Sequence, residues 1–210
     1  MIFTKSYGIA FLIFITSYTL LLLPQINLNR FYAEYFCKLG NYLYQDFHRG
    51  GFVRLSVQDD KGKNDISLFL SKSSWIRDGQ LKGVSTNKAS DRIGYLITAF
   101  FVALTLATPV SLKRKTIALI LGLLIITAFI MLKLNIIIME AYTHVEWFGL
   151  FQDLNEKERI RFWYKNFAAP ATYGYSFVLI VWLGLVLGKN EWRKITGLME
   201  DFVSVKQVKK

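Results

Sequence analysis

The sequence predicts a mainly α-helical membrane protein with four transmembrane helices, and with an outer amphipathic helix plus β-hairpin inserted between helices 1 and 2. Apolar residues make up 53% of the chain, and the charged residues, 20%, fall almost entirely between apolar stretches. Each stretch approaches the ~20 residues that a helix needs to cross a bilayer. The first gap between them is long enough for a folded insertion. The predicted spans are residues 7–24, 93–108, 116–139 and 169–188.

The same pattern divides the chain into four parts. The first span is predicted to be a retained signal anchor, because its apolar run ends at Pro24 without a small-residue cleavage site. The four parts are a signal-anchor helix at 1–24, an extracytoplasmic α/β module at 25–91, a three-helix membrane bundle at 92–188 with an outer loop at 140–168, and a basic cytoplasmic tail at 189–210.

Membrane topology explains the net charge of +11. Basic side chains gather before the first span, in the short turn 113–115 and in the tail after residue 188. The positive-inside rule places these segments in the cytoplasm, so a multi-pass protein of the inner membrane with both termini cytoplasmic is expected. The lipid bilayer is then the main partner of this basic rim, and no nucleic acid is expected as a partner.

The outer segment begins with a helical pattern over residues 28–43, whose apolar and aromatic residues recur at three- and four-residue steps. Two interpretations of this aromatic face stay open. Tyr32 and Tyr35 lie on it and suit a membrane interface. The same face could instead pack on the strands that follow.

A change of period from 3.6 to 2 then predicts a β-hairpin with one apolar face. A lone hairpin is marginal in water, so this face needs a cover. The cover could be the 28–43 helix, a further strand around residues 75–82, or another protein. The last option makes the face a partner-binding surface, formed by Val53, Leu55, Val57, Ile66, Leu68 and Leu70.

The third span carries the arrangement closest to a catalytic one. Lys133 lies in an otherwise apolar run near the predicted outer boundary, and Glu140 and His144 follow seven and eleven residues later. These spacings place the three side chains on one helix face, where they could transfer protons or bind an anion. The alternative is that Lys133 snorkels to the boundary and the other two are solvated.

The same region resembles the back half of the exosortases and archaeosortases, which are multi-pass membrane transpeptidases. The resemblance covers about forty residues, from Thr108-Pro109 and the basic turn to Lys133 and His144. It implies that Lys133 takes the place of a functional arginine and that His144 matches a histidine. The catalytic cysteine of that family has no counterpart, because Ser90 and its neighbours stand at the outer start of the preceding span. The resemblance therefore implies an inactive relative or an accessory protein.

Aromatic residues mark further predicted membrane-interface positions in the outer loop and the tail. The tryptophans expected there are Trp147, Trp163 and Trp192. In the outer loop, Asn155 with Glu158 three residues later predicts the start of a short helix. Its aromatic residues could also form a partner-binding surface.

The function predicted from these features is that of a non-catalytic multi-pass subunit or accessory protein of a cell-envelope assembly. The sequence has two histidines, a single cysteine, Cys37, and neither a metalloprotease motif nor a Gly-rich phosphate loop. No metal site or cofactor is predicted, and other membrane or envelope proteins are the expected partners. The alternatives are an inactive relative of the exosortase-like membrane proteases and transpeptidases, and a small transporter component.

Overall fold

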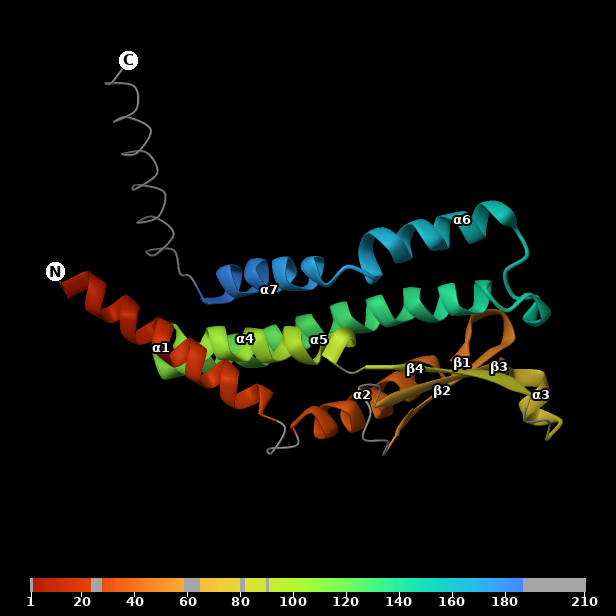
Figure 1. Ribbon diagram of the computed structural model, residues 1–210, viewed down its shortest axis with the longest axis horizontal. Helices are drawn as coiled ribbons and strands as arrows, with labels where there is room; N and C mark the ends of the chain where they lie inside the picture. Colours follow the sequence, from red (N-terminus) through yellow and green to blue (C-terminus); the bar gives the residue numbers. More distant parts are fainter. Residues whose placement is uncertain (1, 24–27, 59–64, 80–81, 90, 187–210) are drawn as a thin grey trace, which may run out of the picture.

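One long helix, α5 (Leu112–Thr143), runs through the whole computed structural model, and the other elements are arranged along it (Figure 1). The structure describes residues 2–23, 28–58, 65–79, 82–89 and 91–186. Most of these residues are helical, and a small antiparallel sheet accompanies the helices. The mainly α-helical fold with a β insertion after the first helix is therefore confirmed.

The N-terminal half of α5 belongs to a helix bundle. It contains α4 at its centre, with α1, α5 and α7 packed against it. Small side chains on α4 allow this close packing, because Ala99, Ala103 and Ala107 are all buried and lie one turn apart. The other helices of the bundle are α1 (Ile2–Leu22), α4 (Leu96–Ala107) and α7 (Ala171–Val186), and α4 is preceded by the π-helical turn η3 (Asp91–Tyr95).

An α/β module and helix α6 accompany the C-terminal half of α5 (Figure 1). The four-stranded sheet of the α/β module is an antiparallel meander in the order β1-β2-β3-β4. The elements of this half are α2 (Leu28–Tyr44), β1 (Asp46–Phe47), β2 (Gly51–Val57), β3 (Ile66–Lys72), α3 (Ser73–Arg77), β4 (Gly83–Lys88), α6 (Leu154–Trp163) and the π-helical turn η5 (Tyr164–Ala168).

The predicted hairpin is present, and its register pairs Val53 with Leu70 and Leu55 with Leu68. The further strand predicted around residues 75–82 is not found at those residues. Residues 73–77 form helix α3, and the third long strand of the sheet, β4, starts at Gly83. The start of α6 also differs by a residue or two, because Asp153 is the cap and its side chain accepts a hydrogen bond from the Asn155 amide.

Two tyrosines tie the module to α5. The Tyr142 hydroxyl lies 2.8 Å from the Phe52 carbonyl oxygen and 3.0 Å from that of Ser71, which are paired positions on β2 and β3. From α2, the Tyr44 hydroxyl donates a 2.7 Å hydrogen bond to the Met131 carbonyl. Because both hydroxyls bond to main-chain oxygens, they connect α2, the sheet and α5 into one body.

Helix lengths support fewer membrane crossings than the four predicted from the sequence. Within the part of the chain that the structure describes, α5 alone is long and apolar enough to cross a bilayer. Residues 154–168 and α7 would make a second crossing, bent by 60°. The other two apolar helical segments, Gly8–Leu22 and Ile93–Ala107, fall short of the length of a full crossing. By length and composition, the described residues thus hold one or two crossings.

We expect the contact between α4 and α5 to depend on a glycine at residue 122. A Cβ atom built there would lie 2.0 Å from the Phe101 ring, whereas one at Gly184 of α7 would meet nothing within 4 Å. Both sites gain the same helix propensity from alanine. The overpacking in Gly122→Ala should cost about 1–3 kcal/mol. Its thermal midpoint in detergent should fall by several degrees while that of Gly184→Ala does not fall. Equal midpoints would contradict this packing.

Candidate functional site

The three polar residues predicted on one face of α5 occupy different environments. Glu140 and His144 are in contact, with His144 Nε2 2.6 Å from a carboxylate oxygen of Glu140. Lys133 is separated from Glu140 by seven residues, about 10 Å along the helix. Its side chain is buried, with 2% of the residue exposed, whereas His144 is exposed. The structure therefore joins Glu140 with His144 and leaves Lys133 apart.

The Glu140–His144 pair can exchange a proton with a bound molecule, because a carboxylate orients the imidazole. The Glu140 carboxylate is mostly covered, and Tyr164 of η5 lies within its electrostatic reach. Across the described residues, no group of three or more histidine, cysteine or acidic side chains could hold a metal ion. The pair thus offers an acid and a base at the surface of α5.

Cys37 is buried on α2, between the sheet and α5. Burial raises the pKa of its thiol to about 11 from the usual 9, so very little thiolate forms near neutral pH. The thiolate is the nucleophilic form of cysteine. Cys37 therefore behaves as a small core residue. The other position that the exosortase resemblance concerns, Ser90, lies outside the described residues.

The apolar face of the hairpin is covered within the chain itself, so the prediction that it binds a partner needs correction. It packs against α2 and the C-terminal half of α5, because these bring buried side chains such as Phe36, Leu134 and Ile138 onto it. Five of the six residues predicted to bind a partner are fully buried, and Val57 is half-buried: Val53, Leu55, Val57, Ile66, Leu68 and Leu70.

The predicted membrane-interface aromatics also separate into different places. Tyr35 is exposed on α2, but Tyr32 turns inward and its ring lies 5.5 Å from that of Tyr95. Trp163 is exposed at the C-terminal end of α6, just before η5. Trp147 lies beyond the far end of α5 and stacks on Trp75 at 5.3 Å, away from the bundle. Trp192 lies outside the described residues.

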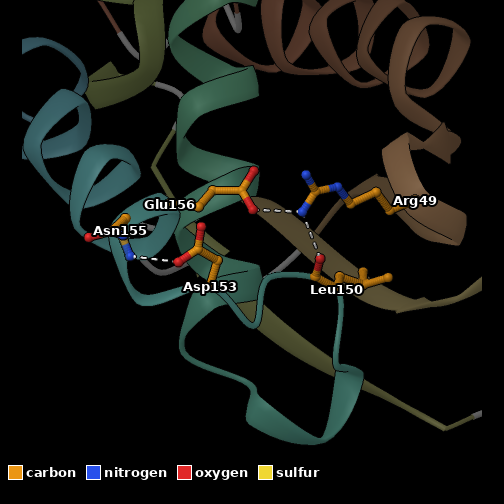
Figure 2. Close-up of polar contacts among 5 residues, drawn as sticks. All are labelled: Arg49, Leu150, Asp153, Asn155 and Glu156. Carbon is orange, nitrogen blue, oxygen red and sulfur yellow. Dashed lines mark hydrogen bonds and ion pairs between the residues drawn. The ribbon is translucent and has the colours of Figure 1, made fainter.

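A cluster centred on Arg49 connects the turn between β1 and β2 to the start of α6 (Figure 2). Its guanidinium lies 2.7 Å from a Glu156 carboxylate oxygen and donates to the Leu150 carbonyl at 3.2 Å. The same group stands over the Phe151 ring, 5.2 Å from its centre. This cluster was not predicted. The His-Arg-Gly-Gly run at residues 48–51 signals a turn, but nothing in it identifies the acidic partner a hundred residues away.

Arg49 holds this position with a backbone conformation that side-chain-bearing residues rarely adopt. Its φ angle is 61°, in the left-handed region, and it is the one described residue other than glycine with a positive φ. Such a conformation costs about 1–2 kcal/mol in a residue that bears a Cβ atom. The contacts with Glu156, Leu150 and Phe151 offset that cost, so the turn depends on them.

Comparisons with known proteins identify no relative. No family model, no curated protein and no solved structure matches this chain. The resemblance to exosortases therefore stays a prediction from the sequence.

We expect Arg49→Gly to be more stable than Arg49→Ala. Both lose the partly exposed ion pair, which contributes up to about 1 kcal/mol, but only glycine removes the left-handed strain. The difference of about 1 kcal/mol corresponds to roughly 2–4 °C in the thermal midpoint of a chain of this size. The matched pair is Arg54→Gly and Arg54→Ala in β2, where the order should reverse. An Arg49→Ala variant as stable as Arg49→Gly would contradict this account of the turn.

Proposed function

We propose that this chain is a multi-pass membrane protein that acts as a non-catalytic subunit or accessory protein of a cell-envelope assembly. The observation that carries the membrane part is the distribution of exposed apolar side chains. On the N-terminal half of α5 alone, these are Leu112, Ile117, Ile120, Leu121, Leu124 and Ile125.

The neighbouring helices extend the same surface around the bundle. Large apolar side chains are exposed on α1, for example Phe11 and Leu12, and on α7, for example Leu179 and Ile180. Soluble monomers rarely expose large apolar patches, whereas large exposed apolar side chains recur here on three helices of one bundle. We therefore place α1, α4, the N-terminal half of α5 and α7 in a bilayer as four crossings. The central helix α4 is shielded from lipid by its neighbours, and short crossings are accommodated by local thinning of the bilayer.

Charge supports an orientation for this arrangement. Lys113, Arg114 and Lys115 stand at the N-terminal end of α5, where Lys115 donates a hydrogen bond to the Leu106 carbonyl at the end of α4. The positive-inside rule assigns this end to the cytoplasm. The sheet, α2, α6 and the C-terminal half of α5 then stand outside the inner membrane.

The accessory role rests on the surface that this outer module presents. Its apolar face is used to cover α5, so a partner would meet the opposite face of the sheet. Side chains there alternate with the buried ones and include Arg54, Ser56, Phe69, Ser85 and Asn87. Interfaces between separately folded proteins mix polar and apolar side chains. A mixed face of this kind therefore suits association with another folded envelope protein.

A mild-detergent pull-down of the tagged full chain from its native membrane tests this function, with mass spectrometry of what is retained. We expect near-stoichiometric envelope proteins with the wild type and at least a several-fold loss with Arg54→Glu. The control Lys38→Glu makes the same charge change on the exposed side of α2 and should keep the partners. A wild-type chain that is extracted from the membrane and purifies alone would sink the accessory role, and a chain found in the soluble fraction would sink the membrane placement.

A further inference from the structure

Lys133 carries a charged side chain that is buried and has no partner among the described residues. Only 2% of the residue is exposed, and it makes no hydrogen bond or ion pair with any described residue. In the described part of the chain, every fully buried side-chain nitrogen or oxygen has a partner. The ammonium of Lys133 is therefore not completely enclosed, although the residue as a whole is almost entirely covered.

Lys133 also lies at a defined depth in the bundle. It is 133 − 115 = 18 residues beyond Lys115, about 27 Å along the helix, close to the ~30 Å thickness of a hydrocarbon core. The turn of α5 just before it contacts α7 and the turn η3 that leads into α4. Phe129 stacks on Phe177 of α7 at 4.1 Å, and Ile130 packs against Gly94 of η3. Lys133 thus stands where the bundle ends and the outer module begins.

Two segments of irregular helix pack against α5 at the height of Lys133. The π-helical turns η3 and η5 both pack against α5 here, the first through Gly94 on Ile130 and the second through Phe167 on Phe129, whose ring centres are 5.5 Å apart. Turns of this kind are rare and occur frequently at functional sites. Two such turns beside the Lys133 ammonium, which has no described partner, favour a functional site at this height of α5.

We propose that Lys133 binds the phosphate of an anionic phospholipid head group, in a site at the outer rim of the bundle between η3 and η5. This inference rests on the membrane placement proposed above. An ammonium largely removed from water gains from a counter-ion, and none of the described side chains supplies one. At this depth the phosphates of the outer leaflet are the available anions, and basic groups between transmembrane helices bind lipid head groups.

Native mass spectrometry of the detergent-solubilised full chain tests the site, with phosphatidylglycerol and phosphatidylcholine as the probes. The wild type should retain phosphatidylglycerol in preference. Lys133→Gln should weaken that binding about fivefold, since a basic group near a head group contributes about 1 kcal/mol. Lys133→Arg should keep it. The control Lys82→Gln removes the same charge from an exposed position beside β4 and should bind as the wild type does.

Equal retention of the two lipids by the wild type would overturn the proposal without any variant, so it does not depend on the stability of Lys133→Gln. Displacement of bound phosphatidylglycerol by millimolar inorganic phosphate would also overturn it, because the site would then take a soluble phosphate. Both outcomes leave the membrane placement intact. That placement fails separately, if the chain stays monomeric in buffer without detergent.

Discussion

The continuity of helix α5 is the constraint on which the rest of the fold depends. Its 32 residues extend about 48 Å at 1.5 Å per residue, which exceeds the ~30 Å of a hydrocarbon core. About a third of it must therefore stand outside any bilayer that covers its first half. This outer third carries large apolar side chains, Leu134, Ile138 and Tyr142, which are all buried. Exposing these side chains to water would be unfavourable, so the outer module is needed to cover this end of α5.

The outer module and α5 stabilise each other for the same reason. A single hairpin cannot support itself, but its apolar face gains two covers at once, because Gly40 of α2 lies against both Leu55 of β2 and Leu134 of α5. The Tyr142 hydroxyl then fixes the sheet to the helix at a pair of main-chain oxygens. On the far side, Arg49 and Glu156 fasten the same module to α6. The module is thus bound to α5 and α6 rather than carried as a separate domain on a linker.

The periodicity of the sequence predicted most of the individual helices and strands correctly. It could not predict how elements distant in the sequence pack together. The 28–43 helix, the hairpin and the apolar helices follow from local patterns of side chains, which each segment carries in its own sequence. What covers the hairpin is decided by α5, more than sixty residues later, and no local pattern reports that. Helical spacing accounts for the contact between Glu140 and His144, whereas the face shared with Lys133 stays a prediction. The environment was not predictable, because the burial of Lys133 depends on neighbouring helices. Arg49 was missed since its acidic partner and its left-handed backbone appear only in three dimensions.

Cysteine accessibility along α5 tests most directly whether one helix serves both a bilayer and an outer module. Single cysteines would be placed in a Cys37→Ala background at Ile120 and Leu124, exposed on the first half, and at Glu146 and Gln152, exposed beyond its far end. Intact membranes would be treated with a membrane-impermeant maleimide. The account predicts rapid labelling at 146 and 152, and none at 120 and 124 until the membrane is dissolved. Equal labelling at all four positions would contradict it, because α5 would then be a helix in water from end to end.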